Sequence, residues 1–301
     1  MKTRTHILWV MGIVLLSGGP FISPALAGGP LKVAVSIPPQ KYFVQRIGGN
    51  LVDVSVMVSP GSSPATYEPR PRQMVDLTRS KIYFAIGVGF EAVWLEKFAH
   101  ASPKMKIVST QDGIEKIAMK THRHHGKGTD HAGDRVPTHM KDPHVWLSPP
   151  LVILQARHIL KGLVRVDPVN RERYESGYRR FCNELVALDL RISRLFQDRG
   201  QDRRFMVYHP AWGYFAKAYD LVQIPVELEG KNPNPRELER LILLARDLGI
   251  RTVFVQPQFS QKSAGTVARA IGGQVVFADP LAPDWAENLL HVAEKIRRAL
   301  K

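Results

Sequence analysis

Short apolar or alternating runs recur along the chain and are separated by segments in which apolar residues return every three or four positions. The runs are typical of strands, and segments such as 70–80, 235–249 and 260–273 are typical of helices. Alternation of the two predicts parallel sheets with helices on both faces. The eight runs divide into two groups of four, which predicts an α/β fold of two (β/α) lobes, each with a four-stranded, mostly parallel sheet: 31–37, 52–58, 81–87 and 106–109, then 204–209, 222–228, 252–257 and 274–279.

One long helix is predicted between the two groups of strands. From about residue 170 to residue 198 the chain has no proline, and its single glycine is Gly177. An apolar stripe with steps of four and three residues passes through Phe181, Leu185, Leu188, Ile192 and Leu195. A helix of this length measures roughly 40 Å, so we expect a stiff connection between the lobes rather than a flexible hinge.

The N-terminus has the pattern of a secretory signal peptide. Lys2 and Arg4 precede an apolar run at 7–16, and the small-x-small motif that follows predicts cleavage after Ala27. The predicted product is therefore an exported, periplasmic protein. The expected division of the chain is a signal peptide (1–27), an N-terminal lobe (28–168), a linking helix (169–199) and a C-terminal lobe (200–301).

Composition narrows the class of protein. The 301 residues are 44% hydrophobic, which is enough for two packed lobes. The only cysteine, Cys182, cannot form an internal disulfide, and its helical context favours a structural thiol over a nucleophile. The formal charge of +15 comes from scattered residues in an exported chain, so we expect a solvated basic surface and no nucleic-acid partner.

A histidine-rich tract occupies residues 120–142 and has almost no apolar content. Such a tract is typical of a loop. Two interpretations remain open at this point: a solvated insertion, or an auxiliary metal-collecting segment. The tract holds five of the eleven histidines in the chain: His122, His124, His125, His131 and His139.

Three polar residues outside the tract are candidate metal ligands. His144 follows the tract directly, and His209 and Asp279 each end a predicted strand and precede a proline. Ligands collect at the carboxyl ends of strands in open α/β sheets, and two imidazoles with a carboxylate suit zinc or another borderline divalent ion. Singly, each residue could equally be a helix cap or a group satisfied by the backbone.

The chain resembles the substrate-binding proteins of metal-ion ABC transporters, in the zinc/manganese group with a rigid helical linker. The resemblance rests on seven stretches in order: VAVSIPPQKYFVQRIGG, VMVSPGSSPATYEPRPRQM, DPHVWLSP, YHPAWGYFAKAYDL, ELEGKNPNPREL, VFVQPQFSQKSA and FADPLA. It implies a metal between the lobes, with His144, His209 and Asp279 at three of the family's ligand positions. Histidine at the position of His209 implies zinc as the cargo, with manganese the second candidate.

Two positions depart from the family pattern. The family's first metal histidine stands in a Pro-His-x-Tyr-Glu-Pro loop, where this chain has Ala65, and Gln256 replaces a common acid. Water could take the vacant coordination position. A histidine of the 120–142 tract, Glu68 or Tyr67 could fill it instead. Alternatively, the site could have changed to another metal or to a metal complex.

The resemblance implies a binding protein that captures a divalent metal ion and delivers it to an inner-membrane ABC permease, without enzymatic activity. We expect a monomer. The alternative is a periplasmic metalloenzyme or chelatase-like protein that uses an open zinc position. Against an enzyme, the sequence contains neither an HExxH helix nor a GxSxG turn. A surface adhesin or a passive metal buffer is a third class.

Overall fold

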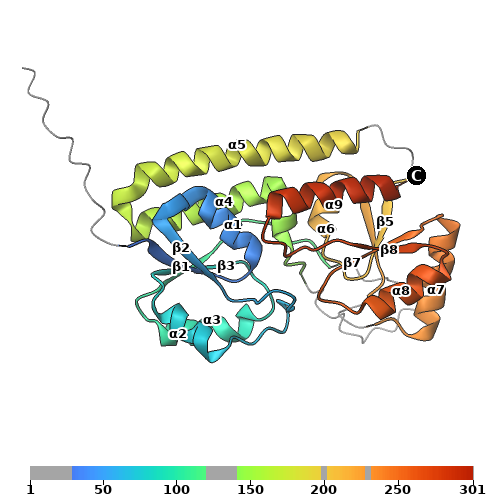
Figure 1. The fold of residues 1–301 in the computed structure, drawn as a ribbon, viewed down its shortest axis with the longest axis horizontal. Helices are drawn as coiled ribbons and strands as arrows, with labels where there is room; N and C mark the ends of the chain where they lie inside the picture. The colour runs from blue at the N-terminus through green and yellow to red at the C-terminus, as the bar shows by residue number, and fades with distance from the viewer. Residues whose placement is uncertain (1–28, 120–140, 198–201, 228–231, 301) are drawn as a thin grey trace, which may run out of the picture.

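The computed structural model describes residues 29–119, 141–197, 202–227 and 232–300. These residues form two four-stranded sheets side by side, with one long helix lying across both (Figure 1). Every strand pair is parallel, which confirms the predicted fold class. The predicted signal peptide and the five histidines of the tract, His122, His124, His125, His131 and His139, lie outside the described residues.

The N-terminal lobe is built on the strand order β2-β1-β3-β4. The central strand β1 is fully buried over Val33 to Val35 and pairs with β2 through Val33 and Val54, and with β3 through Val33 and Ile82. Three helices return the chain between these strands. The elements are β1 (Leu31–Val35), α1 (Pro38–Gly48), β2 (Val52–Val56), α2 (Pro71–Thr78), β3 (Ile82–Ala85), α3 (Glu91–Ala101) and β4 (Lys106–Ser109).

The C-terminal lobe repeats this arrangement with the order β6-β5-β7-β8. All eight predicted strands are confirmed, although most end two or three residues early, where the chain turns into the loops at the carboxyl edge. The elements are β5 (Arg204–Val207), α6 (Gly213–Ala218), β6 (Val222–Pro225), α7 (Pro235–Asp247), β7 (Thr252–Val255), α8 (Gln261–Ala270) and β8 (Gln274–Phe277).

The predicted linking helix is α5, Arg171–Leu195, of 25 residues. It is shorter than the expected span of 169–199, because a 3-10 turn at Pro168–Asn170 precedes it and the backbone leaves helical geometry at Phe196. It packs on α1 and on α4 (Pro149–Val166) in one lobe, and on α9 (Trp285–Ala299) of the C-terminal segment (Figure 1).

The hydrophobic core does not stop at the boundary between the lobes. The ring of Trp285, at the start of α9, meets Phe43 of α1 edge-to-face at 5.0 Å between centroids, and Phe181 of α5 packs on the same Phe43 at 5.8 Å. One continuous cluster therefore contains buried residues of both lobes. The division at residues 168 and 199 stays a prediction.

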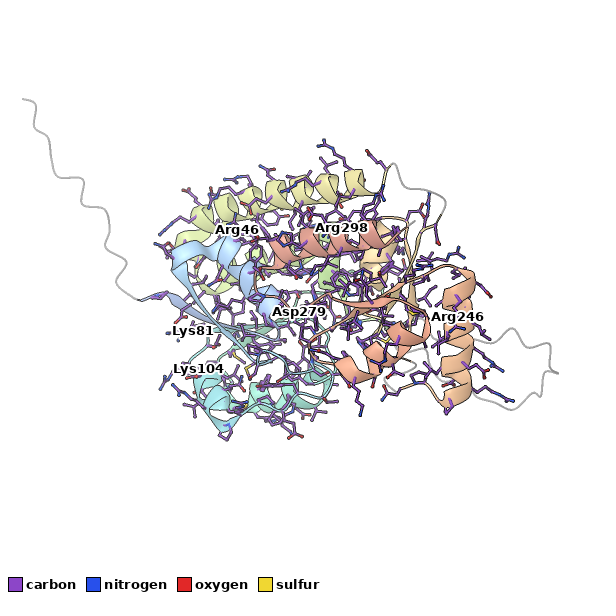
Figure 2. The ribbon with its side chains drawn as sticks, turned by 45° about the vertical axis from the view of Figure 1, so that its right-hand side comes forward. Arg46, Lys81, Lys104, Arg246, Asp279 and Arg298 are labelled. Atoms are coloured by element: carbon purple, nitrogen blue, oxygen red, sulfur yellow. The ribbon has the colours of Figure 1, made fainter. Side chains whose placement is uncertain are left out.

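The basic residues and the single cysteine have the surroundings that the composition led us to expect. Figure 2 places the labelled basic residues Arg46, Lys81, Lys104, Arg246 and Arg298 on different elements of both lobes. Partial burial raises the pKa of the Cys182 thiol, which lowers its nucleophilicity. Across the described ranges, no helix is both long and apolar enough to cross a bilayer.

Candidate metal centre

His144 lies in the segment between the tract and α4, immediately before a 3-10 turn at Val145–Leu147. Asp142 Oδ1 accepts the backbone N–H of His144 at 2.9 Å and lies 2.7 Å from its ring Nδ1. The carboxylate of Asp142 is almost fully buried, and the imidazole packs beside Trp146 at 5.1 Å. The orientation of the ring is thereby fixed, and the lone pair of Nε2 is left free to bind a metal ion.

His209 follows β5, at the carboxyl edge of the C-terminal sheet. Its Nδ1 lies 2.6 Å from Glu227 Oε2, and its ring stacks on Phe259 at 4.7 Å with a 19° interplanar angle. Glu227 is itself buried and follows the neighbouring strand β6. The arrangement repeats that of His144: a buried carboxylate holds Nδ1, and Nε2 remains available. Such carboxylate–histidine pairs orient metal ligands and raise their basicity.

Gln256 holds the backbone of His209 from both sides. Its Nε2 donates to the His209 carbonyl at 2.9 Å, and its Oε1 accepts the His209 N–H at 3.4 Å. An ionised glutamate at this position could accept but could not donate. The structure therefore makes Gln256, a departure from the family pattern, a positioning residue for His209.

The two imidazoles are neighbours. Their ring centroids are 5.4 Å apart. Two imidazoles bound to one tetrahedral zinc, at about 2.1 Å from nitrogen to metal, have ring centres about 5 Å apart. The pair therefore has the spacing of two ligands of one zinc ion.

The two halves of the chain meet directly behind this pair. The hydroxyl of Tyr214, on α6, donates to the Asp142 carbonyl at 3.0 Å and accepts the N–H of Ile117 at 3.1 Å. Gly213 leaves room for the Asp142 carboxylate, because a β-carbon there would lie 2.7 Å from Oδ2. The position of His144 thus depends on α6 of the other lobe.

Asp279 follows β8 and lies between the lobes (Figure 2). Its Oδ1 accepts from Gln258 Nε2 at 3.3 Å and from the N–H of Leu281 at 2.9 Å. In the described part of the chain, no group of three or more His, Cys, Asp or Glu is arranged to hold a metal. The structure therefore brings His144 and His209 together but does not join Asp279 to them, and its role as a ligand stays a prediction.

The loop around Ala65 packs closely against the loop that precedes α3. The N–H of Phe90 donates to the Pro64 carbonyl at 3.0 Å, and Gly89 permits contact because a β-carbon there would lie 2.7 Å from the Ala65 oxygen. The Gly89 loop is in turn fixed by buried Glu91, which accepts the N–H groups of Ile86 and Gly87.

Tyr67, Glu68 and the tract histidines were the candidates to replace the missing histidine ligand, and their surroundings differ. The Tyr67 hydroxyl contacts Ser59 Oγ at 2.8 Å and donates to Gln73 Oε1 at 2.7 Å, so it serves the loop's own structure. Glu68 is exposed and belongs to no metal-competent group among the described residues. The tract histidines lie outside those residues.

Sequence reasoning missed Asp142 and Glu227. Asp142 stands two residues before His144, and Glu227 is the next-to-last residue of the run that contains β6. The weak signal for both was an acid at a strand end or beside a candidate histidine. Which acid reaches which imidazole depends on strand order, because β6 pairs with β5 in parallel and brings Glu227 beside His209.

We predict that the imidazole of His209 becomes protonated only at a pH below the ordinary pKa of histidine. Burial lowers its pKa from 6.5, the Glu227 hydrogen bond partly opposes this, and nearby His144 lowers it further. Since the unfolded chain keeps the ordinary value, this group makes the free energy of unfolding fall as pH drops below about 6.5. NMR titration of the metal-free protein should show His209 ring signals shifting below pH 6.5.

The matched variant is Glu227→Gln, which we expect to lower the His209 pKa further because the stabilising carboxylate is lost. It should also weaken zinc binding by roughly 10- to 100-fold. A His209 titration at or above pH 6.5 in the parent would contradict the prediction.

Comparison with known proteins gives a consistent result. A family model described as the periplasmic zinc-uptake complex component A, ZnuA, matches residues 33–299. A crystal structure of ZnuA superposes with a TM-score of 0.81 at 42% identity, covering 90% of this chain and 99% of that chain.

Curated relatives are more distant in sequence. The high-affinity zinc uptake system protein ZnuA of Bacillus subtilis is 26% identical over 255 residues, covering 82% of this chain and 77% of that protein. The manganese ABC transporter substrate-binding lipoprotein PsaA of Streptococcus anginosus is 23% identical over 297 residues, covering 94% of this chain and 91% of that protein.

Proposed function

The chain belongs to the ZnuA family of periplasmic zinc-uptake components, and we propose that it captures zinc at the His144–His209 pair and delivers it to an ABC permease. One observation carries the proposal: two imidazoles, 5.4 Å apart, each have Nδ1 held by a buried carboxylate. The family is a transport component rather than an enzyme, so the metalloenzyme and chelatase-like alternatives have no support.

The nitrogen-rich pair supports zinc over manganese as the cargo. Imidazole is a good ligand for zinc, whereas manganese favours carboxylate and carbonyl oxygen. The carboxylates of Asp142 and Glu227 are each engaged with an imidazole nitrogen. Asp279 is the proposed third ligand, and it would approach by a small movement of the lobes. The hydrophobic core continues from one lobe into the other, and α5 is a stiff connection between them. Both features limit the movement of the lobes to modest shifts.

Partners and location follow from the family. Substrate-binding components work with a permease and an ATPase, and members are periplasmic proteins or lipoproteins. We infer that this chain is a periplasmic monomer that docks on an inner-membrane permease, and that its signal peptide is cleaved after Ala27. The histidines of 120–142 would raise the local zinc concentration near the site.

The direct test is a titration of the metal-free protein with zinc and with manganese against a competing chelator. We expect one tight zinc equivalent and much weaker manganese binding. A preference for manganese, or equal binding of both ions, would refute zinc as the cargo. Deletion of 120–140 should leave the tight equivalent and remove only weaker binding.

Restoring the missing histidine should strengthen zinc binding. We predict that Ala65→His raises the zinc affinity at least 10-fold, because an imidazole replaces a weak donor and the loop is already fixed by Pro64 and Gly89. Ala65→Leu is the matched control: it adds similar bulk without a donor and should not strengthen binding. Equal affinities for the two variants would show that the loop does not face the metal.

A further inference from the structure

Trp146 ties the segment that carries His144 to the chain that follows β8. It lies in the 3-10 turn directly after His144, is 1% exposed, and packs its ring beside the His144 imidazole at 5.1 Å between centroids. Its indole N–H donates to the Pro280 carbonyl at 2.7 Å, and its own carbonyl accepts the indole N–H of Trp285 at 2.8 Å. Trp146 is therefore bonded twice to the C-terminal segment.

The bond to Pro280 crosses from one sheet to the other. The turn that contains Trp146 leads into α4, which packs on β3 and β4 of the N-terminal sheet. Pro280 follows β8 of the C-terminal sheet, and His209 follows β5 of that same sheet. The bond thus connects the support of the His144 imidazole with the support of the His209 imidazole.

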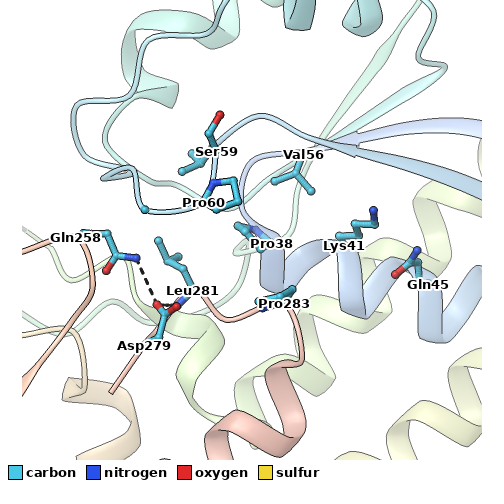
Figure 3. Close-up of a pocket in the computed structure, with 12 residues that line it drawn as sticks. Pro38, Lys41, Gln45, Val56, Ser59, Pro60, Gln258, Asp279, Leu281 and Pro283 are labelled. Atoms are coloured by element: carbon cyan, nitrogen blue, oxygen red, sulfur yellow. Dashed lines mark hydrogen bonds between the residues drawn. The ribbon is translucent and has the colours of Figure 1, made fainter. Parts of the chain in front are cut away.

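The loop that receives this bond borders an open space. Its residues Asp279 and Leu281 line a pocket of about 430 Å³ between the lobes, and α1 with the loop after β2 forms the facing wall (Figure 3). Pro280 is buried and does not line the pocket. Because side-chain packing is missing on the pocket side, the bonds from Trp146 to Pro280 and from Asn288 to the Asp279 carbonyl, at 2.7 Å each, contribute more to the position of the loop.

The spacing of the two imidazoles is the quantity that such a connection controls. The ring centroids of His144 and His209 are 5.4 Å apart, and a shift of about 1 Å would take one nitrogen well beyond the zinc–nitrogen distance of about 2.1 Å. Tyr214 ties the residue two positions before His144, Asp142, to the C-terminal lobe. Trp146 makes the corresponding tie two positions after His144, so the ligand is held on both sides.

We propose that Trp146 is a positioning residue of the zinc site, which holds His144 at the spacing from His209 that one zinc ion requires. This inference rests on the proposed zinc function. The indole acts through its bond to Pro280 and its packing on the His144 ring, and it does not bind the ion itself.

The test is the zinc affinity of the metal-free full chain, measured by competition with a chromophoric chelator. Trp146→Phe keeps an aromatic ring beside His144 and removes the indole N–H, and we expect it to weaken zinc binding by roughly 10-fold, as for other residues that orient a metal ligand. Trp212→Phe is the matched control. Trp212 is equally buried, at 1% exposed, but its indole N–H has no hydrogen-bond partner in the described part of the chain, so its loss should leave the affinity at the parental level.

A double-mutant cycle with His144→Ala separates positioning of the ligand from a general weakening of the fold. If Trp146 acts through His144, adding Trp146→Phe to His144→Ala should change the zinc affinity by less than about 2-fold, because the ring that it positions is already gone. A further loss of roughly 10-fold in that background would show that the two effects are independent, and it would overturn the proposal.

A measurement on the parent protein does not depend on whether a tryptophan variant folds. In nitrogen-15 NMR spectra, the indole N–H of Trp146 should exchange slowly with solvent, because it is buried and bonded, and its signal should shift when one equivalent of zinc is added. The indole of Trp94, on α3, is the internal control and should not shift.

The outcomes distinguish this proposal from the zinc function. Parental affinity of Trp146→Phe, an equal loss in Trp212→Phe, or a Trp146 indole signal that zinc does not shift would each overturn the positioning role and leave the zinc function standing. A parent protein that binds no zinc would overturn both.

Discussion

Replacing His209 with alanine should abolish tight zinc binding. Removing the partner of a metal-bound histidine typically weakens affinity by roughly 10- to 100-fold, and removing the ligand itself should cost more. His209→Ala also leaves the buried carboxylate of Glu227 without its imidazole. We therefore expect at least a 100-fold loss in zinc affinity, measured by competition with a chromophoric chelator.

The same result is expected for His144→Ala, because Nδ1 of each ring is held by a buried carboxylate. His291→Ala is the matched control. His291 is an exposed histidine on α9, so its loss should leave the affinity unchanged. Parental zinc binding by both site variants, with native circular dichroism spectra, would refute the whole metal-site assignment.

Gly177→Ala should cause a large loss of stability for the addition of a single methyl group. Gly177 lies where α5 crosses α1, and a β-carbon there would lie 2.1 Å from the backbone oxygen of Ile47. A backbone oxygen cannot rotate away as a side chain can, so the helices must separate. Overpacking of this kind costs about 1–3 kcal/mol, and we expect about 3 kcal/mol, seen as a lower midpoint in urea.

Gly265 supplies the matched control for this prediction. It also lies inside a helix, α8, but the nearest atom to an added β-carbon is the flexible tip of Arg269, at 3.5 Å. Gly265→Ala should therefore gain up to about 1 kcal/mol from helix propensity. Equal midpoints for Gly177→Ala and Gly265→Ala would contradict the close crossing of α5 and α1.

Much of the architecture follows from local pattern. Every β-rich run became a strand, since alternation and β-branched content act over a few residues. The stripe from Phe181 to Ile192 is buried as its spacing predicts. The two ends of α5 were less predictable from the sequence. They depend on the backbone geometry at Pro168 and Phe196 rather than on the apolar stripe of the helix.

The sequence by itself determined the two α/β lobes, the long helix and the candidates His144, His209 and Asp279, because strand periodicity and the positions of polar residues after strands or after the histidine-rich tract are local features. Only the tertiary structure decided which candidates meet. It brought the two imidazoles to 5.4 Å and gave each its own buried carboxylate, but it left Asp279 on the wall of a neighbouring pocket. Only the Asp142–His144 contact is local. The pairing of the imidazoles joins residues 65 positions apart, and the Glu227–His209 contact joins neighbouring strands whose order no local pattern encodes. They depend on sheet order, on Trp285 crossing to Phe43, and on the packing of Tyr214 against Asp142.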